Sequence, residues 1–69
     1  MDLMKELRNT LTEIDLQILQ VETQARDLHI KKTQLQDRSG NFVMIPLLVA
    51  RAAILESILK LALVQEENA

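Results

Sequence analysis

The feature that most constrains this chain is a long apolar stretch, residues 42–64, in its second half. Within it, only Arg51, Glu56, Ser57 and Lys60 carry clearly polar side chains. A helix on a protein surface normally shows one apolar stripe, whereas this segment is apolar on nearly every side. Such a helix must be covered all round, either by partner helices or by lipid. The kind of surface that covers residues 42–64 therefore decides what this chain can fold into.

Composition limits the ways in which so short a chain can be stabilised. The chain has 69 residues, which is enough for a single domain over residues 1–69. Domains of this size usually need disulfides, a metal or oligomerisation. The sequence has no cysteine and only one histidine, His29, so we expect no disulfide, no metal and no cofactor. With one Gly, one Pro and one Phe as its only aromatic residue, it favours an all-α fold.

Charge and motifs narrow the classes of function. The net charge of −2 gives no overall basic balance, so we do not expect nucleic acid as a partner. The first residues are acidic and amphipathic, unlike the basic and then apolar regions of a signal peptide, which favours a cytoplasmic location. The sequence shows no nucleophile–base set, no Gly-rich phosphate loop and no metalloprotease motif, so it predicts no enzyme.

A heptad pattern runs through the first half of the chain. Apolar residues alternate at spacings of three and four from Met4 to Leu35, and only Lys32 breaks the series. The pattern predicts one helix over about residues 2–36, with Asp2 as its N-cap. We also predict an oligomer interface along this stripe. The residues assigned to that interface are Met4, Leu7, Leu11, Ile14, Ile18, Val21 and Leu28.

A turn and a second helix follow. Residues 36–41 are the turn signal, and Gly40 suits the left-handed backbone that often ends a helix. The start of the second helix is ambiguous because of Pro46. The helix begins either at residue 42 or at about residue 45, with Pro46 in its first turn, and it ends near residue 65. The sequence thus predicts a long antiparallel helical hairpin.

The predicted helices differ in length, at about 50 Å and about 30 Å for a rise of 1.5 Å per residue. In a monomer, about the first dozen residues would then lack a partner and would expose Met4, Leu7 and Leu11. The second helix would also show a bare apolar face. Both defects disappear when hairpins associate, as a dimeric four-helix bundle or as a larger ring. We therefore expect a homo-oligomer built as a helical bundle.

Basic residues gather at the turn end of the predicted hairpin. Residues 26–41 carry four basic against two acidic side chains, whereas residues 1–25 carry two against five. An oligomer would repeat this excess of basic side chains at one end of the assembly, which favours binding of a phosphate-bearing ligand. The alternative is that these charges simply form a solvent-exposed surface. Lys32 interrupts the heptads, so fixing the helix register is its alternative role. The candidate ligand residues in this region are Arg26, Lys31, Lys32 and Arg38.

Arg51 is a further candidate ligand residue because it lies inside the apolar stretch. A buried guanidinium must be paired, since an unpaired buried charge costs several kcal/mol. The expected partner is a carboxylate across the hairpin, such as Asp15 or Glu22, or a ligand phosphate. Glu56 and Lys60 are one helical turn apart and predict an ion pair on the second helix.

Residues 50–61, with the sequence ARAAILESILKL, carry a resemblance that extends to most of the chain. The chain is similar to the hairpin domain of phage anti-defence sponges, which sequester cyclic oligonucleotide signals made by bacterial CBASS or Thoeris immunity. Arg51 matches that family's arginine and Ser57 its small residue, whereas the expected Trp and Tyr are missing. The resemblance implies a ring of hairpins that binds its ligand between subunits.

A shorter stretch, residues 6–19, resembles the first helix of the all-helical chorismate mutases. Arg8 matches their first substrate-binding arginine, but the arginine and lysine expected further along fall at Ala25 and Gln36. Catalysis is therefore not expected from this resemblance.

Two alternatives to a sponge stay open. The first is a protein-interaction or scaffolding hairpin that docks through the exposed heptads of residues 4–18. The second is a small membrane protein in which residues 42–64 span the bilayer. In that case Arg51 and Lys60 would each cost about 2.5–3.5 kcal/mol near the bilayer centre.

Overall fold

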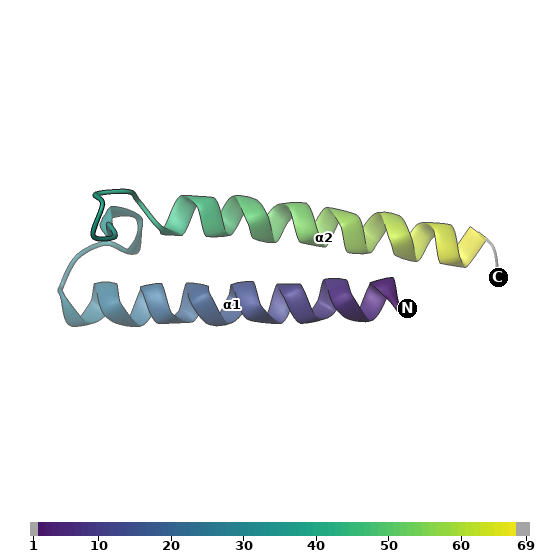
Figure 1. Ribbon diagram of the computed structural model, residues 1–69, viewed down its shortest axis with the longest axis horizontal. Helices are drawn as coiled ribbons and strands as arrows, with labels where there is room; N and C mark the ends of the chain where they lie inside the picture. The colour runs from purple at the N-terminus through teal and green to yellow at the C-terminus, as the bar shows by residue number, and fades with distance from the viewer. Residues whose placement is uncertain (1, 68–69) are drawn as a thin grey trace.

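The protein is an antiparallel pair of helices, of which a computed structural model describes residues 2–67. Helix α1 spans Leu3–Asp27, helix α2 spans Met44–Glu67, and a short 3-10 helix, η1, lies between them at Lys32–Gln34. The long helices lie side by side, and the start of α1 lies at the same end of the hairpin as the end of α2 (Figure 1). The predicted all-α hairpin is confirmed for these residues.

The molecule is only one layer thick. Its principal extents are 50 × 19 × 15 Å, which are the dimensions of two helices laid together. Most domains stack two layers of secondary structure around one core. Few side chains are accordingly buried in the described part of the chain, and they are Met4, Val21, Ala25, Leu35 and Met44.

Helix α1 begins where the sequence predicts. Asp2 is the N-cap, and its side-chain Oδ1 accepts a hydrogen bond from the backbone N–H of Lys5 at 3.2 Å. Glu6 lies in the first turn, where a negative charge complements the positive end of the helix dipole. These two interactions satisfy the start of the helix locally.

The predicted extension of this helix to residue 36 is wrong, because α1 ends at Asp27. The N–H of Ile30 donates to the carbonyl of Ala25 at 3.0 Å, and the N–H of His29 donates to that of Arg26 at 3.1 Å. These two bonds form a Schellman ending, in which His29 takes the left-handed conformation with φ 56°. The sequence pattern missed this ending because the left-handed position usually holds glycine.

Tertiary packing supplies a reason for this early ending. Leu35, which continues the heptad pattern in sequence, instead folds back and is buried against Val21 and Met44. The partly buried Ile18, Val43 and Leu47 pack around this cluster. A continuous helix to residue 36 would carry Leu35 away from the pair of helices. Lys32 consequently lies in η1 and not in a helical heptad, so its predicted role in setting the helix register is wrong.

The predicted turn at residues 36–41 is a tight turn within a longer connection. The N–H of Gly40 donates to the carbonyl of Asp37 at 3.0 Å, and Gly40 has φ 83°. The side-chain Oδ1 of Asp37 accepts from the N–H groups of Ser39 and Asn41, at 2.8 and 3.0 Å. Gly40 therefore supplies the expected left-handed residue, but within this turn and not at the end of α1.

Helix α2 begins at Met44, between the two starting points that the sequence left open. Pro46 lies in its first turn, where a missing N–H removes no hydrogen bond of the helix. The helix continues to Glu67, slightly beyond the predicted end near residue 65. Helices α1 and α2 have 25 and 24 residues, so the predicted mismatch in length is wrong. The first turns of α1 are therefore covered by α2 of the same chain, and Met4 is buried.

Candidate interaction surface

Each helix turns one stripe of residues, spaced by three and four, towards the other helix. We call these two facing stripes the inner seam, and all their residues are buried or half-buried. On α1 the inner seam consists of Met4, Leu7, Leu11, Ile14, Ile18, Val21 and Ala25. On α2 it consists of Met44, Leu47, Arg51, Ile54, Ile58 and Leu61. Most residues predicted to form an oligomer interface therefore face α2 of their own chain. Leu28, in contrast, lies past the end of α1 and is 61% exposed.

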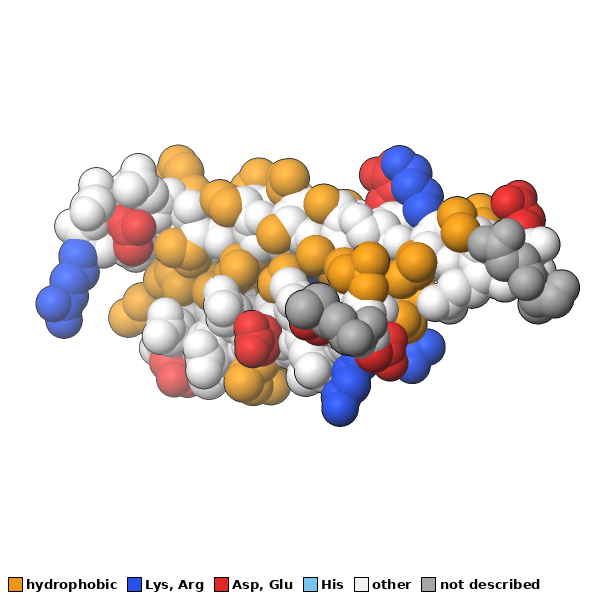
Figure 2. Space-filling view, turned by 45° about the vertical axis from the view of Figure 1, so that its right-hand side comes forward, with side chains coloured by type: hydrophobic (Ala, Val, Ile, Leu, Met, Phe, Trp, Pro, Cys, Tyr) orange, Lys and Arg blue, Asp and Glu red, His pale blue; other side chains and the backbone are white. Residues whose placement is uncertain are grey.

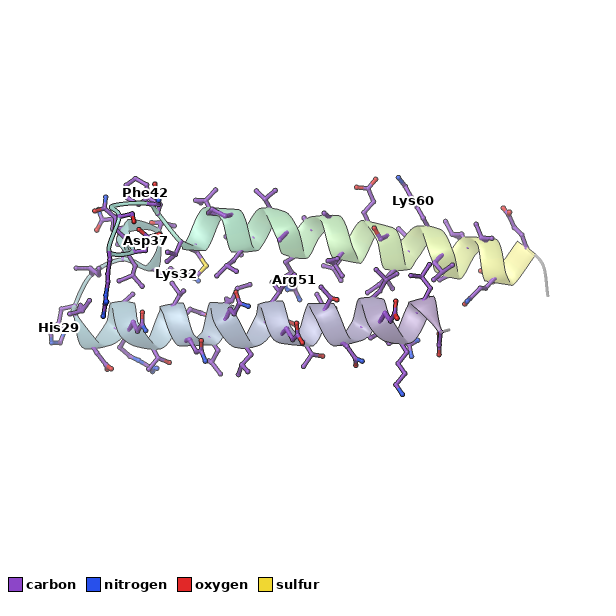
Figure 3. The ribbon with its side chains drawn as sticks, in the orientation of Figure 1. His29, Lys32, Asp37, Phe42, Arg51 and Lys60 are labelled. Atoms are coloured by element: carbon purple, nitrogen blue, oxygen red, sulfur yellow. The ribbon has the colours of Figure 1, made fainter. Side chains whose placement is uncertain are left out.

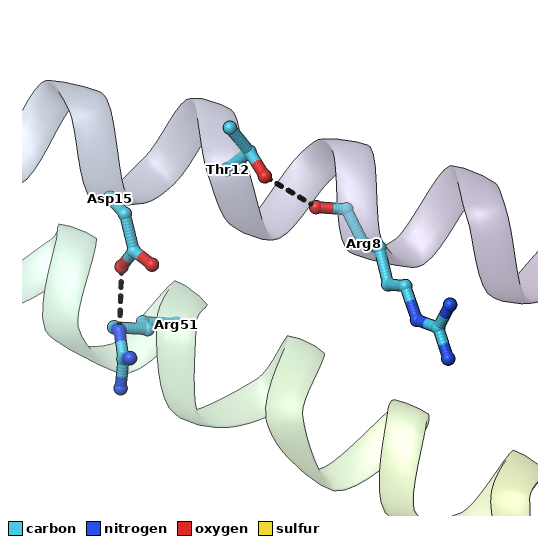
Figure 4. A network of polar contacts seen from close by, with 4 residues as sticks. All are labelled: Arg8, Thr12, Asp15 and Arg51. Carbon is cyan, nitrogen blue, oxygen red and sulfur yellow. Dashed lines mark hydrogen bonds and ion pairs between the residues drawn. The ribbon is translucent and has the colours of Figure 1, made fainter.

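Arg51 is the charged residue of the inner seam, and its partner is a carboxylate. Its Nε donates to Oδ1 of Asp15 on α1 at 2.7 Å, so the ion pair joins the two helices (Figure 4). Asp15 is one of the two carboxylates expected from the sequence. The expected burial of Arg51 is wrong, because the two side chains are 41% and 46% exposed. An ion pair this exposed contributes little to stability.

Arg8 lies on the same side of the hairpin as this ion pair (Figure 4). The carbonyl of Arg8 accepts a hydrogen bond from Oγ1 of Thr12 at 3.0 Å, which is a common way for a threonine inside a helix to satisfy its hydroxyl. The arginine that matches the chorismate mutase pattern is thus exposed on α1.

The basic candidates of the connection are only partly brought together. Arg26 and Lys32 line one open hollow of about 410 Å³, whose walls include the apolar Leu19, Ala25 and Ile30. Nζ of Lys32 lies 3.5 Å from Oε2 of Glu22, which lines the same hollow. Lys31 precedes η1, and Arg38 lies in the tight turn. The hollow therefore contains two basic side chains and one acid.

Arg51 does not join this basic group. Figure 3 shows it midway along the hairpin and directed into the space between the helices, whereas Lys32, His29 and Asp37 lie at the connection end. His29 is the exposed left-handed residue of the ending of α1. The five candidate ligand residues thus do not form one site within a single chain.

A second and larger groove has a lining that the sequence reading did not single out. It has a volume of about 810 Å³ and lies between α1, the connection and the start of α2. Its wall on α1 carries Gln17, Gln20 and Gln24, and its floor includes Val21 and Leu47. The sequence pattern that could have predicted this wall is the spacing of the three glutamines by three and four residues, which places them on one face of a helix.

An exposed apolar stripe lies on α2, beside the inner seam. A second stripe with spacings of three and four runs along this helix, offset by one residue from the first. We call it the outer seam, and it consists of Ile45, Leu48, Ala52, Leu55, Leu59 and Ala62. All six residues are exposed, with Ile45 at 51%, Leu48 at 43%, Leu55 at 39% and Leu59 at 60%. In Figure 2, separate hydrophobic side chains also lie along the side of the upper helix, α2, that faces away from α1, together with one acidic and one basic group.

The outward side of α1 is different. Polar residues such as Asn9, Glu13 and Thr23 dominate it, and its exposed leucines, Leu16 and Leu19, do not continue into a heptad stripe. Helix α1 is therefore an amphipathic helix satisfied by one neighbour. Helix α2 has two adjacent apolar seams and only one neighbour. The outer seam is the candidate interaction surface.

Three further observations concern expectations raised by the sequence. Across residues 2–67, no helix is both long and apolar enough to cross a membrane. In the same residues, no three or more His, Cys, Asp or Glu side chains are grouped so that they could hold a metal ion. The predicted pair between Glu56 and Lys60 is confirmed, with Nζ 3.0 Å from Oε1.

Comparison with known proteins yields no match to this chain, whether to a family model, to a curated protein or to a solved structure.

Proposed function

We propose that this chain is a non-enzymatic helical hairpin that acts by self-association, and that the outer seam of α2 binds a helix of another copy of the chain. The observation that carries the proposal is the exposure of that seam along the length of α2. Burying a leucine or isoleucine side chain contributes about 1.5–3 kcal/mol, and the outer seam offers four such side chains. Contiguous apolar patches of this kind mark interaction surfaces on proteins.

This proposal places the docking surface on α2 and not on residues 4–18. Leu7 and Leu11 on α1 are half-buried against α2, so they offer little surface to another chain. The outer seam, in contrast, has the spacing that a second helix needs for knobs-into-holes packing. It also contains no charged residue, because Glu56 and Lys60 lie at its margin and pair with each other.

Light scattering on the purified chain tests the proposal, with substitutions on α2 and α1 compared. We expect the wild type to have a mass that is a multiple of 7.9 kDa. Leu55→Glu should reduce this to the mass of one chain, because it places a charge in the centre of the outer seam. Leu16→Glu is the matched control on the outward side of α1 and should retain the wild-type mass. A wild type that scatters as a single chain, or a Leu55→Glu variant that assembles normally, contradicts the proposal.

A second candidate function is a sponge for a phosphate-bearing cyclic nucleotide. The observation that favours it is the hollow in which Arg26 and Lys32 lie beside apolar walls, since a cyclic nucleotide offers both phosphates and bases. It ranks second because Glu22 competes for Lys32, and Asp15 already pairs with Arg51.

Calorimetry with cyclic dinucleotides and trinucleotides tests this second candidate. We expect heat of binding from wild type that is lost in Arg26→Ala and retained in Lys60→Ala, whose cation lies on α2 and pairs with Glu56. The absence of heat with every cyclic nucleotide, at protein concentrations well above micromolar, excludes it.

A further inference from the structure

We infer that the partner of the outer seam is the outer seam of a second copy of this chain, packed antiparallel about a two-fold axis into a four-helix bundle. This inference rests on the proposed function and adds to it which surface of the other copy is bound and in which direction. A two-fold interface uses the same patch on both subunits, so the patch must be complementary to itself. The surface area, the order of side chains and the positions of the charges each bear on that requirement.

The surface area fits the needs of a dimer. The chain exposes 5534 Å², whereas a compact monomeric protein of 7.9 kDa exposes about 4,400 Å². The excess is therefore about 1,100 Å². Each partner in a standard protein–protein interface buries about 800 Å². A second hairpin laid on α2 thus removes an amount of surface close to the excess that the single layer leaves.

The order of large and small residues along the outer seam favours the antiparallel direction. When the seam meets its own copy reversed about a point between residues 53 and 54, Ile45 lies opposite Ala62. In the same arrangement Leu48 lies opposite Leu59, and Leu55 lies opposite Ala52. Every layer then holds at least one large side chain, as close packing requires. In a parallel arrangement Ala52 would lie opposite Ala52 of the other copy, and Ala62 opposite its Ala62. Two layers would then contain only small side chains and leave cavities.

The charges near this surface agree with the same arrangement. Glu56 and Lys60, at the margin of the outer seam, are 65% and 72% exposed and pair with each other within one chain. The carboxylate of Asp15 already engages Arg51 at 2.7 Å in the inner seam of α2. Pairing of the outer seams therefore leaves no unpaired charge at its centre. The antiparallel direction also sets opposite ends of the two α2 dipoles beside each other.

Disulfide trapping tests both the partner and the direction, because the natural chain has no cysteine and each variant then carries one thiol. Ile45→Cys and Ala62→Cys are prepared separately and oxidised alone and as a mixture. Antiparallel pairing brings residue 45 of one copy opposite residue 62 of the other. It separates two copies of residue 45 by about 25 Å along the axis, at 1.5 Å per residue. A disulfide needs Cα atoms within about 7 Å.

We expect a covalent dimer in the mixture, containing one chain of each variant, and mostly monomer when each variant is oxidised alone. Leu16→Cys, on the outward side of α1, is the control and should not cross-link to Ile45→Cys. Cross-linking of each variant to itself would show parallel pairing and overturn the inference. An assembled wild type, disrupted by Leu55→Glu but with no cross-link in the mixture, overturns this pairing and leaves the proposed function standing. A wild type of single-chain mass removes both.

Discussion

The two ends of the hairpin are packed differently. At the connection end three segments meet, and Met44 is fully buried while Val21 and Leu35 are 8% exposed. At the open end only α1 and α2 meet, where Met4 is 9% exposed and the inner-seam residues Leu7 and Leu61 are only half-buried. Two helices alone cover one stripe of each other, so a third segment is needed before side chains are fully removed from water. The connection supplies that third segment at one end only.

This difference indicates where the hairpin is self-sufficient. The connection end resembles a small core closed by Leu35, whereas the remainder of α2 still presents the outer seam to solvent. A chain of this length buries only about 60% of its unfolded surface at best, so such a core gives marginal stability. We therefore expect the connection end to depend on contacts within the chain, and the rest of α2 to depend on association. Substitutions at the two ends separate these contributions.

The largest effect on the free energy of unfolding is expected at the connection end, from Met44→Ala. This substitution leaves a cavity against Val21 and Leu35, and truncating a buried methionine costs about 2–5 kcal/mol. The matched variant at the open end is Leu61→Ala, which we expect to cost clearly less because Leu61 is only half-buried. Denaturant unfolding followed by circular dichroism, at one fixed protein concentration, measures both changes. Equal losses for the two variants would show that the ends do not differ.

A smaller effect, of opposite sign, is expected from His29→Gly at the same end. His29 has φ 56°, and a left-handed conformation costs a residue with a Cβ atom roughly 1–2 kcal/mol. Glycine should therefore raise the free energy of unfolding by about 1 kcal/mol without changing the mass of the assembly. Gly40→Ala is the reciprocal variant, because Gly40 has φ 83° and open space where a Cβ would lie. It should lower stability through backbone strain alone. A destabilising His29→Gly would refute this account of how α1 ends.

The sequence was sufficient to predict the main elements of this fold. The heptad spacing from Met4 to Val21, the cap at Asp2 and the turn around Gly40 all depend on neighbours in sequence, and all are present. The end of α1 was not predictable in this way. The spacing continued to Leu35, and the helix stops because Leu35 packs across the chain against Met44. Tertiary packing therefore overrode the local pattern.

The candidate surface was predictable only in part. The apolar character of α2 on nearly every side was visible in the sequence, and so was a carboxylate such as Asp15 as the partner of Arg51. The assignment of the docking surface to α1 depended on the assumed length of that helix. Once α1 and α2 match in length, the first heptads are covered within the chain and the exposed seam lies on α2. Sequence spacing cannot decide which of two adjacent stripes, offset by one residue, faces the other helix.

The smallest effect is expected midway between the two ends, where Asp15 and Arg51 join the helices at 2.7 Å. A double-mutant cycle with Asp15→Ala, Arg51→Ala and the combined variant should give a coupling of about 0.5–1 kcal/mol, because both side chains are partly exposed. The coupling should fall in 1 M salt, where the screening length is about 3 Å. Glu56 and Lys60 form the control pair, with an expected coupling of about 0.3–0.5 kcal/mol within one helix. A coupling between Asp15 and Arg51 that is absent at low salt would mean that this ion pair does not hold α2 in place along α1. The alignment of the helices would then depend on the packing at the connection end alone.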